Sequence, residues 1–268
     1  MNNRIKVRPM HKSEWLKGGI FDEEPATWQQ LQVYVAQVFR DLGYLEVQSP
    51  YSLVGVRTTK EVDVYAVDPS AVPPIRIACE CKHWSVNVHQ GVVMEFRTVI
   101  EDTGVNRGFI ISKVGFQSPG AYDAVRNTAV VLISFDEFTR LFFDQWLTAM
   151  SLRLAKASKL IFPFFDPYGF ETLPELPPNM VQTFSELRKK YHVVFSSGAL
   201  LLDNAEAPVS LAIIARNPQI IKPLKELGIT SYRQFFSVLL TRASQALIEF
   251  SSLFGVDPET LRSSQTSD

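Results

Sequence analysis

Strand-like apolar segments alternate with helical patterns over the first half of the chain, and this alternation limits the folds that the chain can adopt. The clearest segments are "IRIACECK" (75–82), "RGFIIS" (107–112) and "AVVLIS" (129–134), each of a length typical of buried strands. Apolar residues at helical spacing lie between them. A sheet made from such strands needs helices on its faces, so we expect one α/β domain over residues 26–149.

Capping signals mark where two helices of this domain begin. Thr27 and Gln30 form a T-x-x-Q capping box, and apolar residues then recur at helical spacing until Gly43 ends the segment. Ser134 and Glu137 form a second capping box directly after the last strand-like segment. The first signal predicts an amphipathic helix of about four turns.

Two strand-like segments carry charged residues inside apolar runs. The segment "EVDVYAV" contains Glu61 and Asp63, and the segment "IRIACECK" contains Glu80 and Lys82. Because alternate residues of a strand face the same side, each pair shares one face of its strand. If the two strands are neighbours, three carboxylates and one ammonium group converge on one patch.

This charged patch has two interpretations. Acidic and basic residues are common on the solvent-exposed face of an antiparallel sheet, and the ion pairs between them contribute little to stability. However, both segments are too apolar for strands with one face in water, and a buried carboxylate needs a cation beside it. The second argument favours a functional site that contains Glu80 and Lys82.

Composition divides the chain into three parts. Residues 1–25 show no clear periodicity, and we expect them to form an N-terminal arm. Residues 150–268 begin with a segment rich in Pro and aromatic residues and continue with helical patterns, which predicts a mainly helical domain of unknown role. The chain has a formal net charge of −1, and neither large part is strongly basic. Any contact with DNA must therefore come from local patches.

Several classes of protein are not supported by the sequence. Cys79 and Cys81 lack the CxxC spacing of redox and zinc sites, which favours reduced thiols in the cytosol. No apolar run reaches the roughly 18 residues of a membrane span, and residues 1–20 lack the apolar block of a signal peptide. Phosphate-loop, zinc-protease and esterase motifs are also missing. We expect a cytoplasmic protein without membrane contact.

The motifs and their order resemble the Mrr-like restriction endonuclease family of the PD-(D/E)xK nuclease superfamily. Asp63 in "EVDV" and Glu80 and Lys82 in "ECK" match the D…(D/E)xK signature. The element order is also similar over residues 26–146: a helix ending in Leu-Gly-Tyr, the two motif strands, a helix, a strand leading to Gly-Phe, a short helix and a last strand. The resemblance implies a restriction-endonuclease-like mixed sheet flanked by helices.

The resemblance also implies roles for individual residues. Asp63 and Glu80 would be ligands of Mg²⁺, for which Mn²⁺ could substitute, and the backbone carbonyl of Cys81 would be a further ligand. Lys82 would be the catalytic lysine, which stabilises charge at the phosphate or positions the attacking water. Many family members have a Glu on the first helix, and this chain has Gln29 there as a candidate catalytic residue. Its amide could orient water or bind the metal through oxygen, but it supplies no charge.

The function implied by the resemblance is that of a metal-dependent DNA endonuclease that hydrolyses phosphodiester bonds in restriction or phage defence. One alternative is a DNA repair or recombination nuclease that uses the same core. Another is a nuclease-like binding module within a defence complex. The expected partners are DNA and, because cutting both strands needs two active sites or two visits, a second copy of the chain. A defence-complex partner belongs to the module alternative.

Overall fold

The computed structural model forms two compact units, an α/β unit followed by a mainly helical one. It describes residues 19–56, 59–165, 175–203 and 207–264, together with Leu16 and Leu173. The first unit consists of Glu23–Trp146 among these residues, and the second contains the described residues of 11–22 and those from Leu147 onward. Most of the expected N-terminal arm, residues 1–25, lies outside the described residues.

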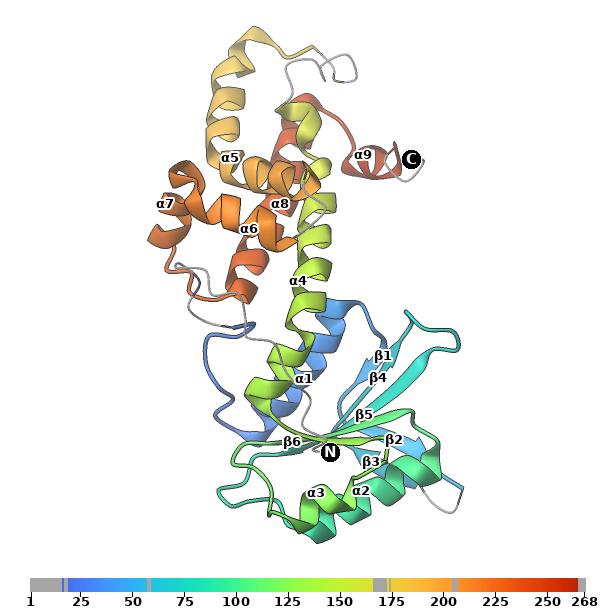
Figure 1. Cartoon of the computed structure of the whole chain (residues 1–268). Coiled ribbons are helices and arrows are strands. Elements are labelled where there is room, and N and C mark those ends of the chain that lie inside the picture. The colour runs from blue at the N-terminus through green and yellow to red at the C-terminus, as the bar shows by residue number, and fades with distance from the viewer. Residues whose placement is uncertain are drawn as a thin grey trace. The chain divides into compact units, whose positions relative to one another are not determined.

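A mixed five-stranded sheet forms the centre of the first unit (Figure 1). Its strands are β1 (Leu45–Gln48), β4 (Val64–Asp68), β5 (Ile75–Lys82), β6 (Arg107–Ser112) and β7 (Val130–Ser134), in the order β1-β4-β5-β6-β7. Neighbouring strands are antiparallel from β1 to β5 and parallel from β5 to β7. The expected mixed sheet is therefore confirmed, and "IRIACECK" is its central strand.

Helices cover both faces of this sheet. α1 (Trp28–Leu42) packs against β1, β4 and β5, whereas α2 (Gln90–Thr103) packs against β6 and against α3 (Gly120–Ala124). Figure 1 shows α2 and α3 on the side of the sheet opposite to α1. α4 (Phe135–Lys159) begins directly after β7. The two faces of β5 are therefore in different environments, one toward α1 and one toward α2.

The capping residues in the sequence mark helix ends in the structure. The backbone N–H of Gln30 donates to Oγ1 of Thr27 at 3.2 Å, and α1 ends at Gly43, whose φ of 80° is in the left-handed region that glycine adopts readily. The N–H of Glu137 donates to Oγ of Ser134 at 3.1 Å, and the N–H of Ser134 donates back to Oε2 of Glu137 at 2.9 Å. Both predicted helix starts are confirmed.

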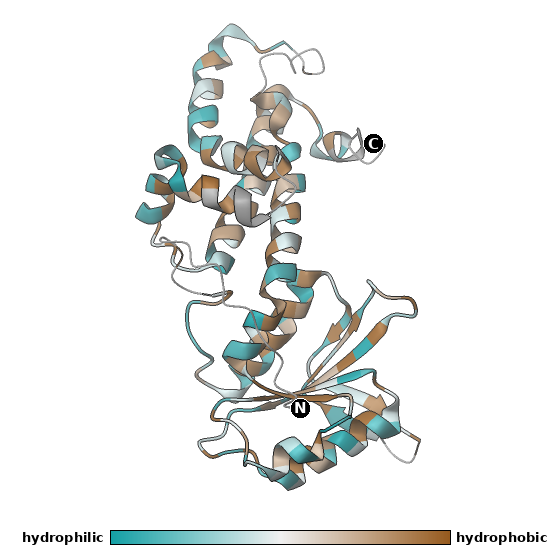
Figure 2. Ribbon diagram, in the orientation of Figure 1, coloured by the Kyte–Doolittle hydropathy of each residue, from teal (hydrophilic) through white to brown (hydrophobic). Residues whose placement is uncertain are grey.

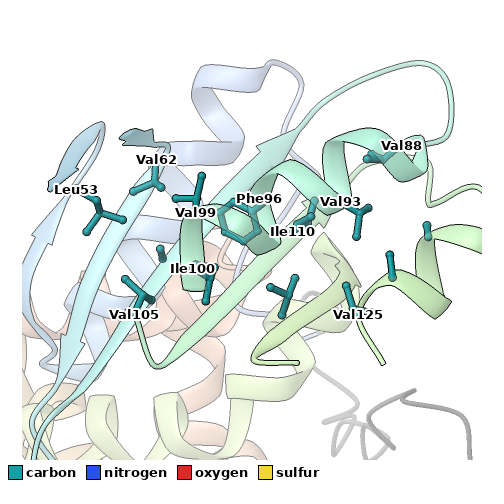
Figure 3. Close-up of a cluster of buried hydrophobic side chains, with 14 of the residues drawn as sticks. Leu53, Val62, Val88, Val93, Phe96, Val99, Ile100, Val105, Ile110 and Val125 are labelled. Atoms are coloured by element: carbon teal, nitrogen blue, oxygen red, sulfur yellow. The ribbon is translucent and has the colours of Figure 1, made fainter. Parts of the chain in front are cut away.

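A hydrophobic core lies between the sheet and α2 (Figure 3). Phe96 and Ile100 of α2 meet Ala78 of β5 and Ile110 of β6 there. Gly108 of β6 permits this close approach, because a Cβ atom at that position would lie 2.7 Å from Cγ1 of Ile100 and 2.8 Å from Cε1 of Phe96. α2 and β6 therefore approach to a distance at which only a residue without a side chain fits at position 108.

Aromatic side chains fill the opposite face of the sheet. Phe39 of α1 packs edge to face on Phe138 and Phe142 of α4, with ring centroids 5.6 and 5.5 Å apart. Phe109 of β6 lies 5.9 Å from both α4 rings. Such pairs add stabilisation beyond that of the buried area. Because Phe109 is paired with Cys79 across β5 and β6, the Cys79 side of β5 faces this aromatic core.

One expectation for the strands is wrong. The segment "EVDVYAV" does not form a single strand but bends at Asp63 into β3 (Thr59–Val62) and β4. β3 pairs with β2 (Tyr51–Val54) in a separate two-stranded sheet, and only β4 joins the main sheet. Val62 therefore packs in the core under α2, while Val64 is buried outside that cluster, so the strict alternation expected across Asp63 is interrupted.

The second unit is built from helices. Its elements after α4 are η1 (Phe162–Phe164), η3 (Pro178–Met180), α5 (Val181–Asp203), α6 (Ala207–Arg216), α7 (Pro218–Glu226), α8 (Tyr232–Phe254) and α9 (Pro258–Ser264). Along α5 and α8 hydrophobic and hydrophilic residues alternate, as Figure 2 shows, and α5 packs against α6, α7 and α8. None of the helices in the described part of the chain is long and apolar enough to cross a membrane.

α4 is longer than the sequence pattern indicates. The capping box predicts its start, but the change in composition near residue 150 suggests a domain boundary, whereas the helix continues to Lys159. The reason is that the helix interior contains no Gly or Pro that would end it.

Substitution of Gly108 tests the close packing of α2 on the sheet. Gly108→Ala places a methyl group against Ile100 and Phe96, and overpacking of this kind costs about 1–3 kcal/mol. We expect urea unfolding to show a loss of stability in that range. Gly91→Ala is the matched control, because Gly91 is an exposed residue of α2 and its added Cβ atom would lie 3.2 Å from its nearest neighbour, Nδ1 of His89, against 2.7 Å at Gly108. Equal stability of the two variants would contradict the close contact.

Candidate active site

The bend between β3 and β4 places Asp63 beside the central strand. Oδ2 of Asp63 accepts a hydrogen bond from the backbone N–H of Cys81 at 2.6 Å, and Oδ1 accepts one from Nε2 of Gln32 on α1 at 2.5 Å. The carboxylate is thus held by two donors from two different elements. Each carboxylate oxygen has a second lone pair, so both can still accept a cation.

Glu80 and Lys82 lie at the carboxyl end of β5, on the face toward α2. Val64 of β4 is paired with Cys79, so the chain reaches Asp63 at the level of Glu80. Nζ of Lys82 lies 2.5 Å from Oε1 of Glu80, and both side chains are about one-fifth exposed, at 19% and 20%. The structure therefore brings the three predicted site residues together, Asp63 from the bend before β4 and Glu80 and Lys82 from the paired strand β5.

Burial makes the two carboxyl groups of the site difficult to ionise. It is the main cause that raises the pKa of Asp63, and the hydrogen bond from Cys81 and the charge of Lys82 lower this pKa only in part. Burial also raises the pKa of Glu80, and the nearby charge of Asp63 raises it further despite the contact with Lys82. Two close, partly buried carboxylates form a place where an added positive charge is favourable.

The donor set suits a hard divalent cation that keeps most of its water. Within residues 19–56, 59–165, 175–203 and 207–264, no group of three or more His, Cys, Asp or Glu side chains is arranged to hold a metal ion. Mg²⁺ in proteins is commonly bound by only one or two carboxylates together with water, and Asp63 and Glu80 provide two. The repulsion between these carboxylates supports the same assignment.

Cys81 contributes its backbone to the site, and its side chain lies elsewhere. The thiol groups of Cys79 and Cys81 are buried, and burial raises the pKa of both well above the ordinary value. They are therefore protonated at neutral pH and are poor metal ligands. Only the main chain of Cys81 fits the predicted ligand role.

Gln32 is a site residue that the sequence analysis did not identify. Gln29, at the position that the resemblance assigns, is exposed on α1, whereas Gln32 lies one turn later and contacts Asp63. Both amides follow the same helix start, and residues three apart share a helix face. The resemblance pointed to Gln29, whereas the structure places Gln32, one turn later, against Asp63.

The loop after β5 places aromatic and imidazole groups beside Lys82. Nζ of Lys82 lies 5.2 Å from the ring centroid of Trp84, within cation–π range, and the Trp84 ring stacks on His89 with centroids 6.1 Å apart. Nε2 of His83 is 2.9 Å from the carbonyl oxygen of Pro25, which holds the loop against the start of α1. The indole of Trp84 thus lies beside the ammonium group of Lys82.

Comparison with known families agrees with this geometry. Residues 24–142 match the model of the Mrr catalytic domain, described as a restriction endonuclease. Residues 24–142 are an Mrr-type restriction endonuclease domain. The match coincides with the sheet, α1 to α3 and the start of α4, and it confirms the resemblance inferred over residues 26–146.

Other comparisons add little to this result. No curated protein matches the chain. A solved structure entitled "Crystal Structure of Protein of Unknown Function AF1548" is similar, with 19% sequence identity and a TM-score of 0.35. The alignment covers 41% of this chain and 58% of that chain.

The raised pKa values predict how stability depends on pH when no metal is bound. Ionisation of Glu80 opposes folding, because its pKa is raised in the folded state. The neutral form of Glu80 contributes its full stabilisation at pH values below the pKa of this group in the unfolded state. This contribution is lost as the pH rises through the pKa of Glu80 in the folded state. We expect Glu80→Gln to melt a few degrees higher than the wild type at pH 7.5 in EDTA. The difference should shrink toward pH 4.

Thermal melting followed by circular dichroism across this pH range measures the effect. Glu101→Gln is the control, because Glu101 is an exposed carboxylate on α2 in an i,i+4 pair with Arg97. A lower melting temperature for Glu80→Gln at pH 7.5 would show that the Glu80–Lys82 pair stabilises the sheet and would contradict the prediction.

Proposed function

We propose that the first unit is a Mg²⁺-dependent endodeoxyribonuclease that hydrolyses phosphodiester bonds of DNA in restriction or phage defence. The observation that supports the proposal most directly is the meeting of Asp63, Glu80 and Lys82 at the end of the central strand of an Mrr-type domain. Mn²⁺ is expected to substitute for Mg²⁺, because it also prefers oxygen ligands. A second copy of the chain would supply the site for the other DNA strand.

Each residue of the site has a separate role in this proposal. Asp63 and Glu80 would bind the cation together with the backbone carbonyl of Cys81, and the bound cation would polarise the phosphate and acidify a water molecule. Lys82 would move from Glu80 to the phosphate and stabilise the charge that develops there. Gln32 would hold the Asp63 carboxylate in the orientation required for metal binding.

The sequence is also compatible with two other functions. A repair or recombination nuclease would use the same residues on branched or damaged DNA. A nuclease-like binding module in a defence complex would need no cation, yet two close carboxyl groups with raised pKa values are costly to keep without a chemical role. The burial of Asp63 and Glu80 therefore favours an enzyme.

Substrate and metal requirements provide the first test. The full chain is incubated with supercoiled plasmid, methylated plasmid, branched DNA, single-stranded DNA and RNA, each with Mg²⁺, with Mn²⁺ and with EDTA. We expect cleavage of duplex DNA that needs a divalent cation. Cleavage restricted to branched DNA would support the repair alternative. Absence of both cleavage and calorimetric Mg²⁺ binding would support the binding module.

Substitutions of Glu80 and Lys82 separate metal binding from catalysis. Glu80→Ala removes a ligand and is expected to abolish both calorimetric Mg²⁺ binding and cleavage. Lys82→Ala leaves the ligands and releases Glu80 from its 2.5 Å contact, so Mg²⁺ binding should persist or strengthen. Cleavage should fall by about 10²–10³-fold, as for loss of a transition-state donor.

The matched control for these substitutions is Arg126→Ala, which removes an exposed cation of an ion pair with Asp123. Full cleavage by either Glu80→Ala or Lys82→Ala would contradict the assigned roles. Loss of folding in both variants would support the alternative in which the two residues form a structural ion pair.

The two glutamines of α1 are tested as a pair. Gln32→Ala removes the donor to Oδ1 of Asp63, and loss of such a supporting contact costs about 10–100-fold in metal affinity or activity. Gln29→Ala changes an exposed side chain at the position marked by the resemblance. We expect the larger loss of Mg²⁺ affinity and cleavage rate from Gln32→Ala. A larger loss from Gln29→Ala would assign the role to that residue.

A further inference from the structure

A cleft of about 580 Å³ lies within the helical unit, and its described lining residues all lie outside residues 24–142. Most of them belong to α5, and others come from Phe165 and α7. The lining residues on which the argument depends are Phe165, Phe184, Ser185, Arg188, Lys189 and His192. This volume is within the range of about 300–1,000 Å³ that is typical of small-ligand sites.

The polar part of this cleft is suited to an anion. Arg188, Lys189 and His192 line it from two successive turns of α5, and none of the described lining residues is Asp or Glu. Ser185 lies one turn before Arg188 and offers a hydroxyl group on the same side of the helix. Two cationic side chains, Arg188 and Lys189, in a concave site without Asp or Glu among its described lining residues favour a negatively charged ligand.

Arg188 is held in a fixed position before any ligand binds. Its Nη2 atom donates to the backbone carbonyl of Phe165 at 2.9 Å, and its guanidinium carbon lies 5.6 Å from the ring centroids of both Phe165 and Phe184. A guanidinium group has five N–H donors, of which this hydrogen bond uses one. Other N–H groups can therefore bind a phosphate with little loss of side-chain entropy.

The apolar part of the cleft has rigid aromatic walls. Phe165 stacks on Phe195 at 4.5 Å and packs edge to face on Phe250 at 5.6 Å. Phe184 packs on Phe254 at 5.5 Å. Phe165 is buried and Phe184 is partly exposed, so these contacts hold the walls in place before a ligand enters. The exposed part of the Phe184 ring can pack on a flat ring.

From these contacts we propose that the helical unit binds a nucleotide in this cleft, either free or as part of a DNA strand. Arg188 and Lys189 bind its phosphate, and Phe184, which is partly exposed, contacts its base. A phosphate alone would use only the cations of the cleft, and an uncharged aromatic ligand would use only its aromatic surface. This binding needs neither a divalent cation nor Asp63, Glu80 and Lys82.

Calorimetric titration of the full chain in EDTA tests the proposal without contribution from the nuclease metal. The ligands are the four deoxynucleoside 5′-monophosphates, the matching nucleosides, inorganic phosphate and a short single-stranded oligonucleotide. We expect at least one nucleotide to bind about tenfold more tightly than its nucleoside and than inorganic phosphate. Stronger binding of the oligonucleotide would indicate a nucleotide within DNA, and stronger binding of the monophosphate would indicate a free ligand.

Substitutions assign the binding to this cleft. Arg188→Gln is expected to weaken nucleotide binding at least about tenfold, and Lys189→Gln several-fold, because each removes a charged donor. Lys225→Gln is the control, since Lys225 is an exposed cation of α7 outside the cleft. Because Arg188 packs against two rings, its variant is checked by thermal melting. If Arg188→Gln does not fold, Ser185→Trp replaces it as the test. Ser185 is exposed, and the introduced tryptophan would fill the cleft without removing a charge and should abolish binding.

Three results would overturn the proposal: no nucleotide binding at millimolar concentration, equal affinity for phosphate and nucleotides, or equal affinity of the cleft variants and the control. Asp63→Asn separates this site from the nuclease site and is expected to bind nucleotides normally. Loss of nucleotide binding in Asp63→Asn would place the ligand at the nuclease site and would also contradict the proposal.

Discussion

The hydrogen bond from the backbone N–H of Cys81 to Oδ2 of Asp63 is the interaction on which the candidate active site depends. Asp63 lies where the chain leaves the small β2–β3 sheet and enters the main sheet, so this 2.6 Å bond joins that bend to the central strand. The bond from Gln32 adds α1 to the same point. The position of the carboxylate is therefore set by three elements that are far apart in sequence.

This arrangement is costly, and the surrounding core makes it tolerable. Burial raises the pKa of Asp63 and of Glu80, so each ionised carboxylate reduces the stability of the metal-free protein. The central strand is nevertheless paired on both sides and covered by α1 and α2. Aromatic packing of Phe39 and Phe109 on α4 adds stability that does not depend on the charged groups. The paired and covered central strand can thus hold two carboxylates close together despite this cost.

Sequence patterns predicted the elements whose signals are local. β5 and β6 have the expected bounds, and α1 begins and ends at its capping residues, because strand length, apolar character and caps are properties of short segments. The division of "EVDVYAV" at Asp63 was not predicted, since no Gly or Pro marks the bend. Gln32 was not identified because its contact depends on how α1 is rotated against the sheet, which is a tertiary property.

The chemistry of the catalytic unit cannot by itself explain how a target is chosen. Asp63, Glu80 and Lys82 are suited to a phosphate group, which is the same at every position of DNA and carries no sequence information. Residues 26–147 contain 10 Lys or Arg and 13 Asp or Glu, so the surrounding charge does not attract DNA strongly. Selection must then come from groups that contact bases. In the part of the chain that the structure describes, the cleft with Arg188 and Phe184 combines a phosphate donor with an aromatic surface, so the nucleotide site proposed there would supply a contact that the proposed catalytic residues do not make.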